Sequence, residues 1–356
     1  MKIILIILDG ISEEKVPELN DMTPLECADT PTIDKIIEKG RHTKTTFCPS
    51  DREPDSLNCI LSILGVEEKS IPKNRAYLEA VAENINVKDA EVVLRCNLVS
   101  IKNNKLESFN GKGLSNSEME TASQHVKLSS SIKFHHISNY RNLLIVNKNK
   151  LTDALKNAPP HENVGQSIDG LLMDIKNINV LNEFVKDNKT TINNNDYMFF
   201  PWGVSEIIKL PEFSALHNKS CSCVCSAEIV KGIAKCMNID LPELSYATGD
   251  TDTDLVEKAN AVTNEIKNHD VVIVHINGTD EVSHRKDLMG KIKFIEKIDR
   301  EFLSILYEKF NENTKIIIVS DHQTSSQTGK HEKGCVDLIV NIPISNPVKG
   351  TSIWLK

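Results

Sequence analysis

Continuous apolar runs rich in β-branched residues occur three times along the chain, at Lys2–Leu8, Val271–Ile276 and Lys315–Val319. Runs of this kind predict strands that are covered on both faces, as in a parallel sheet. Between the last two runs, Lys291–Phe310 carries apolar residues at helical spacing. Two further helical patterns lie earlier in the chain, at Thr32–Lys39 and Ser226–Met237. The two ends of the chain therefore predict one α/β domain with a mostly parallel sheet.

The middle of the chain has a different pattern. It is polar and rich in Asn and Lys, with a short alternating run at Ala90–Ile101 and a Pro-Pro-His sequence at 159–161. Alternation and turn residues of this kind predict short strands and loops. We expect a smaller inserted α+β domain at residues 85–168, within a core domain formed by residues 1–84 and 169–356.

Composition narrows the class of protein. A chain of 356 residues with 40% hydrophobic residues can bury the cores of two domains. Its net charge of −8 would repel nucleic acid and anionic lipid. The apolar run Ile3–Leu8 is too short for a signal peptide or a membrane span. We therefore expect a cytoplasmic protein that binds neither nucleic acid nor membrane.

The cysteines predict neither disulfides nor a zinc cluster. Nine is an odd number, and their spacing fits no known disulfide or zinc pattern. Cys221, Cys223 and Cys225 alternate with other residues, so they would share one face of a strand. We expect reduced thiols and a buried strand at this position, since free cysteine behaves mainly as a small core residue.

Each of the three apolar runs is followed within a few residues by an aspartate. The carboxyl ends of parallel strands meet at one edge of a sheet, where ligands bind, so these carboxylates should come together with the histidines close to two of them. Taken singly, such an aspartate is usually a turn or cap residue and such a histidine is usually solvated. Together they suit two metal ions, with Mn²⁺ or Zn²⁺ favoured over Mg²⁺ or Ca²⁺. The six candidate ligands are Asp9, Asp280, His284, Asp321, His322 and His331.

Ser56 is the candidate nucleophile for a phosphoryl group held by two metals. It opens an apolar helical run, Leu57–Leu64, that ends at Gly65. The simpler interpretation of its position is a helix N-cap. The same position would place its hydroxyl among free N–H groups that favour an alkoxide and a phosphate.

The chain resembles the archaeal type of cofactor-independent phosphoglycerate mutase, a family of the alkaline phosphatase superfamily. The resemblance runs nearly from end to end. It rests on Lys2–Gly10 (KIILIILDG), Thr23-Pro24-Leu25-Glu26, the Ser56–Gly65 helix, Arg95-Cys96-Asn97, Tyr140-Arg141-Asn142, Pro159-Pro160-His161, Trp202-Gly203, Ala247-Thr248-Gly249 and Asp321-His322.

The resemblance implies an alkaline-phosphatase-like three-layer core and assigns the metal ligands. One metal would be held by Asp280, His284 and His331, and the other by Asp9, Ser56, Asp321 and His322. The cofactors implied are two divalent ions, Mn²⁺ before Zn²⁺ or Co²⁺, and no 2,3-bisphosphoglycerate. The implied activity is the interconversion of 3-phosphoglycerate and 2-phosphoglycerate, with Ser56 taking up the phosphoryl group and returning it.

The inserted domain would clamp the phosphorylated small-molecule substrate. The candidates are Arg75, which matches an arginine of the family's hinge region, and Arg95, Asn97, Arg141 and His161 in the insert. Arginine suits bidentate contacts to carboxylate or phosphate. A surface salt bridge is the alternative interpretation for Arg75 and Arg141, and a turn residue is the alternative for His161.

Several departures from the family pattern concern the substrate. Leu57-Asn58-Cys59-Ile60 replaces an Asp-Thr-Ala-His stretch, and the active-site lysine could be Lys209 or Lys219. The alternative function is therefore a metal-dependent phosphatase, or a mutase acting on another phosphorylated small molecule. A binding protein without turnover is a third hypothesis. The oligomeric state stays open.

Overall fold

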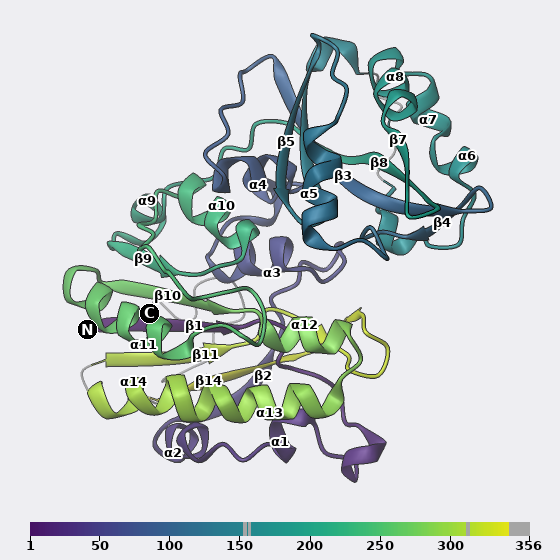
Figure 1. The fold of residues 1–356 in the computed structure, drawn as a ribbon. Helices are drawn as coiled ribbons and strands as arrows, with labels where there is room; N and C mark the ends of the chain where they lie inside the picture. Colours follow the sequence, from purple (N-terminus) through teal and green to yellow (C-terminus); the bar gives the residue numbers. More distant parts are fainter. Residues whose placement is uncertain (152–154, 156–157, 311–313, 342–356) are drawn as a thin grey trace. The chain divides into compact units, whose positions relative to one another are not determined.

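The computed structural model describes residues 1–151, 155, 158–310 and 314–341. The chain divides into two compact units (Figure 1). Unit 1 consists of Met1–Pro72 and Lys209–Lys356, and unit 2 consists of Lys73–Ile208.

Unit 1 is built on a six-stranded, mostly parallel sheet with the strand order β2-β14-β11-β1-β10-β9. The central strand β1 runs parallel to both β10 and β11, and β9 runs parallel to β10, whereas β14 is antiparallel to β11 and β2. The predicted fold class is confirmed. The strands are β1 (Lys2–Leu8), β2 (Arg41–Thr45), β9 (Cys221–Val224), β10 (Val271–Ile276), β11 (Thr314–Val319) and β14 (Val336–Val340).

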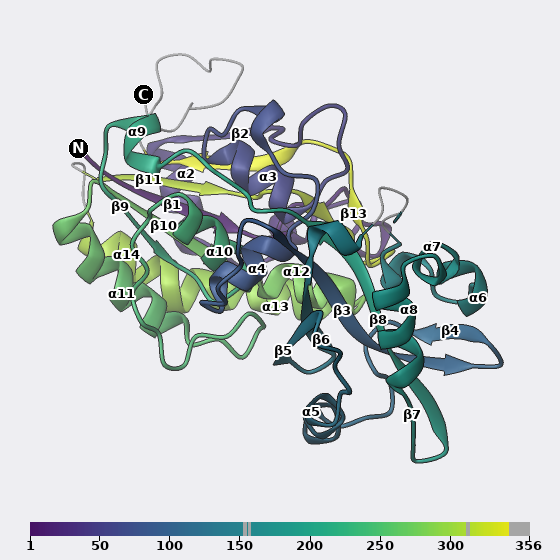
Figure 2. The same ribbon diagram turned by 90° about the horizontal axis from the view of Figure 1, so that it is seen from above.

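Helices cover both faces of this sheet, so unit 1 has three layers (Figures 1 and 2). On one face, α2 (Pro31–Lys39), α11 (Leu255–Asn268), α13 (Leu288–Ile298) and α14 (Ser304–Lys309) share a core with Ile4, Ile6 and Leu8 of β1. The segment Asp299–Leu303 joins α13 to α14 as a π-helix, labelled η5. Helices α3 (Ser56–Ile63) and α10 (Glu228–Cys236) lie on the other face.

Burial explains why the apolar runs form the central strands. Every residue from Ile3 to Leu8 is at most 2% exposed, and alternate side chains enter opposite layers. Burying one such Ile or Leu side chain stabilises the fold by about 1.5–3 kcal/mol. Cys221, Cys223 and Cys225 are buried free thiols on or next to β9, as predicted.

The remaining elements of unit 1 are short. They are η1 (Pro17–Leu19), α1 (Pro24–Cys27), η2 (Glu68–Ser70), α9 (Phe213–His217), α12 (Gly278–His284), β12 (Gln323–Thr324) and β13 (His331–Glu332). Two of them, α12 and β13, carry predicted site residues.

Unit 2 is an antiparallel sheet with helices. The strand order is β5-β6-β3-β8-β7, with β4 paired to β3. Its strands are β3 (Glu91–Lys102), β4 (Lys105–Ser108), β5 (Ile132–Ser138), β6 (Arg141–Asn147), β7 (Lys189–Ile192) and β8 (Asn195–Ser205). Its helical segments are α4 (Ala76–Ala82), α5 (Asn116–Gln124), η3 (Lys148–Lys150), η4 (Pro160–Glu162), α6 (Ile168–Leu171), α7 (Met173–Lys176) and α8 (Asn179–Asp187).

Unit 2 extends beyond the predicted insert of residues 85–168 at both ends. Before residue 85, α4 packs on β3 and β8. After residue 168, β8 pairs with residues Val93 to Ile101 of β3, which is most of the length of β3. The apolar run in β8 fits a core strand of either unit, so the sequence pattern alone did not reveal its pairing with β3.

Candidate metal centre

The three predicted aspartates meet at the carboxyl edge of the parallel sheet. Asp9 directly follows β1, Asp321 follows β11 by two residues, and Asp280 lies in α12, just after β10. All three are buried, at 1%, 1% and 7% exposure. Gly10 lets the chain turn tightly here with a φ of +62°, and a Cβ at this position would lie 3.0 Å from Asp280 Oδ1.

Asp280, His284 and His331 form the first ligand group. Asp280 Oδ2 lies 3.1 Å from His284 Nε2, and Asp280 Oδ1 lies 3.4 Å from His331 Nε2. The Nδ1 atoms of the two histidines face the carbonyl oxygens of Gly329 and Pro54, at 2.9 and 3.0 Å. A carbonyl only accepts, so each Nδ1 carries a hydrogen, and Nε2 is the ring atom turned toward Asp280. Against the effect of burial, Asp280 raises the pKa of His284 to about 9. The two Nε2 atoms are 3.2 Å apart, and a cation between them would replace the proton that His284 holds there.

Asp9, Asp321, His322 and Ser56 form the second group. His322 Nε2 lies 3.3 Å from each of Asp9 Oδ1, Asp321 Oδ2 and Ser56 Oγ. Asp9 Oδ1 and Asp321 Oδ2 are buried and have no hydrogen-bond partner. Buried carboxylate oxygens are normally satisfied, so two orphaned oxygens facing one imidazole nitrogen fit a bound metal ion.

Electrostatics supports the same conclusion. Burial and the nearby charges of Asp321 and Asp280 raise the pKa of Asp9 well above its ordinary value, and burial raises the pKa of Asp321 to about 6. The second group thus lacks positive charge, which a divalent cation would supply. The ligand atoms of Asp280, His322 and His331 lie within 4.8 Å of one another, as do those of Asp9, Asp321 and His322. His322 belongs to both of these sets, so the two ligand groups adjoin each other, and each offers atoms that could hold a metal ion.

Ser56 is the first residue of α3, and it is not the N-cap. Asp55 is the cap, because its side chain accepts a hydrogen bond from the backbone N–H of Asn58 at 2.7 Å. The cap interpretation of Ser56 is therefore wrong. Its hydroxyl instead donates to Asp9 Oδ2 at 3.4 Å and faces His322.

His275 belongs to this site and was not predicted from the sequence. It is fully buried in β10, and its Nε2 lies 3.1 Å from Asp9 Oδ2. Burial lowers the pKa of His275 to about 4, so the ring is neutral and its Nε2–H donates to the carboxylate. A partner of this kind orients a metal ligand. The sequence could have indicated His275 only through the pairing of β1 with β10, which brings position 275 close to Asp9.

Four of the five predicted substrate residues interact through Glu79 and Trp202 in unit 2. Glu79 binds the Nε atoms of Arg75 and Arg95 at 2.9 and 3.1 Å. The Arg95 guanidinium stacks on the Trp202 ring, 4.3 Å from its centre. Burial and the nearby charge of Arg75 lower the pKa of Arg95 to about 10. Two guanidinium groups thus share one carboxylate, which leaves this cluster with a net positive charge.

Asn97 and His161 contact the same Trp202. Asn97 Oδ1 accepts from Trp202 Nε1 at 2.9 Å, and its Nδ2 donates to the Phe109 carbonyl at 3.0 Å. The His161 ring lies 5.8 Å from the Trp202 ring. Arg141 lies 6.0 Å from the ring of the adjacent Tyr140. The side-chain oxygen of Asn97 thus holds Trp202 in place against the Arg95 guanidinium.

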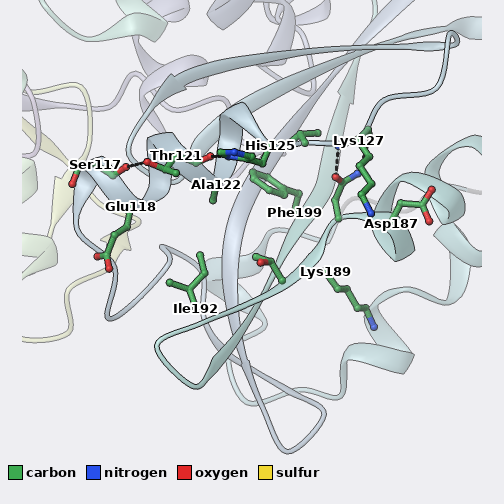
Figure 3. Close-up of a pocket in the computed structure, with 13 residues that line it drawn as sticks. Ser117, Glu118, Thr121, Ala122, His125, Lys127, Asp187, Lys189, Ile192 and Phe199 are labelled. Atoms are coloured by element: carbon green, nitrogen blue, oxygen red, sulfur yellow. Dashed lines mark hydrogen bonds between the residues drawn. The ribbon is translucent and has the colours of Figure 1, made fainter.

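Figure 3 shows a separate pocket of about 520 Å³ within unit 2. Its wall comes from α5 and the residues just after it, the end of α8, β7 and β8, and includes Glu118, His125, Lys127 and Phe199. None of the predicted site residues lines this pocket, so we assign it no part in the chemistry of the metal centre.

The three-layer fold, with two carboxylate and imidazole groups at its sheet edge, defines a metal-dependent enzyme. The chain belongs to the metalloenzyme superfamily, whose family model matches residues 1–347.

Curated relatives named 2,3-bisphosphoglycerate-independent phosphoglycerate mutase confirm the predicted resemblance. The protein of Methanopyrus kandleri is 28% identical over 93% of this chain and 85% of its own length. The protein of Methanosphaera stadtmanae is 29% identical over 96% of this chain and 89% of its own length.

Two solved structures share the fold. A protein from Pyrococcus horikoshii matches with a TM-score of 0.76 and 24% identity, over 95% of this chain and 87% of its own. The cofactor-independent phosphoglycerate mutase from Thermoplasma acidophilum matches with a TM-score of 0.56 and 18% identity, over 96% of this chain and 89% of its own. None of the helices among the described residues is long and apolar enough to cross a membrane.

Proposed function

We propose that the protein interconverts 3-phosphoglycerate and 2-phosphoglycerate through a phosphoserine at Ser56, without 2,3-bisphosphoglycerate. The observation that carries this proposal is the position of Ser56, whose hydroxyl faces Asp9 and His322 within one of the two ligand groups. The names of the curated relatives, which align over nearly the whole chain, supply the substrate.

In this mechanism Ser56 Oγ forms a bond to phosphorus while the bond from phosphorus to the substrate oxygen breaks. The hydrogen bond to Asp9 Oδ2 gives the serine proton an acceptor, and the oxygen that loses the phosphoryl group takes up a proton. Glycerate then reorients and its other hydroxyl takes the phosphoryl group back. Two divalent ions, with Mn²⁺ preferred to Zn²⁺ or Co²⁺, would lower the pKa of the serine hydroxyl and neutralise phosphate charge.

One metal would be held by Asp280, His284 and His331, and the other by Asp9, Ser56, Asp321 and His322. We assign the acidic groups of the substrate to Arg75, Arg95 and Arg141, with His161 beside them. Asn97 then acts indirectly, because its side-chain oxygen already accepts from Trp202.

A metal-dependent phosphatase is the second candidate, favoured by the residues that follow Ser56. The Leu57, Cys59 and Ile60 side chains are at most 3% exposed. Packed into the core, they offer no acid or base beside the nucleophile where the family has an aspartate and a histidine. Water could then compete with glycerate for the phosphoserine.

An enolase-coupled assay with 3-phosphoglycerate, without bisphosphoglycerate, separates the two. We expect turnover that requires added Mn²⁺, that Ser56→Ala abolishes and that Ser62→Ala, on the same helix, leaves intact. Absence of turnover, together with Mn²⁺-dependent release of inorganic phosphate from a generic phosphate ester, would refute the mutase and leave a phosphatase.

A further inference from the structure

Thr324 lies between the two ligand groups and contacts both. It is a fully buried residue on β12. Its Oγ1 donates to Asp280 Oδ1 at 2.7 Å and lies 3.1 Å from His322 Nδ1. Asp280 belongs to the first group and His322 to the second, so a single hydroxyl connects them.

The single hydrogen of the Thr324 hydroxyl determines which partner it donates to and which partner it accepts from. A threonine hydroxyl has one hydrogen, and an ionised carboxylate can only accept. The hydrogen of Thr324 is therefore directed to Asp280, and toward His322 its oxygen can only accept. His322 Nδ1 must then carry a hydrogen, which leaves the lone pair of the neutral ring on Nε2. That nitrogen faces Asp9, Asp321 and Ser56 at 3.3 Å.

We propose that Thr324 is a positioning residue that holds His322 in its Nδ1–H tautomer and couples the two ligand groups. The inference rests on the proposed two-metal site. Without the hydroxyl, the two tautomers of His322 would become closer in energy, and one of them turns an N–H toward the carboxylates, where a metal ion would bind.

The protein holds Thr324 in place through its backbone. The Thr324 carbonyl accepts from Lys291 Nζ at 2.8 Å, and its N–H donates to the Ser12 carbonyl at 3.1 Å. Lys291 pairs with Glu13 Oε2 at 2.9 Å, and Glu13 Oε1 accepts from the Ser326 backbone N–H at 2.7 Å. Lys291 is 0% exposed and Glu13 is 3% exposed, so this network anchors the segment from inside the core.

Gly10 limits the space around the hydroxyl. A Cβ at position 10 would lie 2.5 Å from Thr324 Oγ1. The hydroxyl is therefore confined between the Gly10 backbone, Asp280 and His322. Its position is set by the fold and does not need a bound ligand.

The test compares Thr324→Val, which removes the hydroxyl, with Thr324→Ser, which keeps it. Thr263→Val is the matched control, because the Thr263 hydroxyl donates within α11, to the Ala259 carbonyl. The first readout is the ¹⁵N spectrum of the histidine rings in metal-free, full-length protein, with the His322 signals assigned through His322→Gln. We expect the Nδ1–H tautomer in the wild type, the Ser variant and the control, and a mixture in the Val variant.

The second readout is a calorimetric titration with Mn²⁺ alone. We expect Thr324→Val to weaken binding about 10- to 100-fold, and Thr324→Ser to stay close to the wild type. An unchanged tautomer and affinity in Thr324→Val would overturn the inference. If the valine variant does not fold, Thr324→Ala replaces it in the same comparison.

These outcomes are independent of the proposed reaction. A wild-type protein that binds Mn²⁺ in a Thr324-dependent way but does not convert 3-phosphoglycerate would refute the proposed function and support the inference. Mutase turnover with a tautomer that does not depend on Thr324 would do the reverse.

Discussion

Replacing Glu13 by Gln should destabilise unit 1 strongly, because it leaves the Lys291 ammonium buried without a carboxylate. The two groups are 2.9 Å apart, at 3% and 0% exposure. Burial lowers the pKa of Lys291, and the charge of Glu13 opposes that effect. Removing one partner of a buried pair costs about 3–5 kcal/mol. Lys291 keeps the Thr324 carbonyl as an acceptor, so we expect the free energy of unfolding to fall by about 3 kcal/mol.

Hydrogen exchange of β1 peptides measures this loss within unit 1. A fall of about 3 kcal/mol corresponds to exchange that is roughly 100-fold faster or more. Chelator is present throughout, because bound metal would itself add stability. The control is Glu53→Gln, which breaks an exposed pair with Lys333 at a similar distance of 2.8 Å and should change exchange far less.

The double variant Glu13→Gln/Lys291→Met, together with the two single variants, completes a double-mutant cycle. Removing both charges leaves no unpaired ion in the core, so the double variant should be more stable than the sum of the single losses predicts, by about 2 kcal/mol. Single losses that simply add, within about 0.5 kcal/mol, would refute the reasoning, because independent residues behave in that way.

Three further predictions follow from the site and its surroundings. His275→Phe removes a donor to Asp9 and should weaken Mn²⁺ binding about 10- to 100-fold in a calorimetric titration, and equal affinity would contradict it. Burial lowers the pKa of Lys258 from 10.5 to about 8, so the native state loses this proton at a lower pH than the unfolded chain does. The free energy of unfolding of the wild type, measured in urea relative to Lys258→Met, should be constant below pH 8 and rise by at most about 3 kcal/mol toward pH 10.5. A difference between the two proteins that does not change with pH would refute this. Arg95→Lys keeps the charge but loses the planar fork that stacks on Trp202, so KM for 3-phosphoglycerate should rise about tenfold or more, and an unchanged KM would exclude Arg95 from the substrate site.

The sequence predicted the elements whose local pattern is compatible with a single kind of secondary structure. The strands β1, β10 and β11 are buried on both faces, so their apolar runs predicted them nearly to the residue. Asp9 follows such a strand directly, and Asp321 follows another by two residues. Because parallel strands end at one edge, these positions were enough to predict that the carboxylates meet.

The residues that support the ligands could not be predicted in the same way. His275 lies inside an apolar run and reads as a core residue, and Thr324 carries no charge that would mark it. The Glu13–Lys291 pair is 278 residues apart in the sequence. Such contacts depend on register and packing between distant segments, which periodicity along one segment does not report.

The altered residues after Ser56 separate the position of the proposed nucleophile from the choice of substrate. Asp55 caps α3, and Asn58 accepts from Arg52 Nη1 at 3.0 Å while Leu57 and Cys59 pack into the core. These contacts hold Ser56 beside Asp9 without the acid and base that the family has in this stretch. The substitutions therefore leave Ser56 in place and alter only what surrounds it. Under the proposed function, selection among phosphorylated substrates then falls to groups outside α3, which makes the arginines of unit 2 that we assign to the substrate the decisive place to test it.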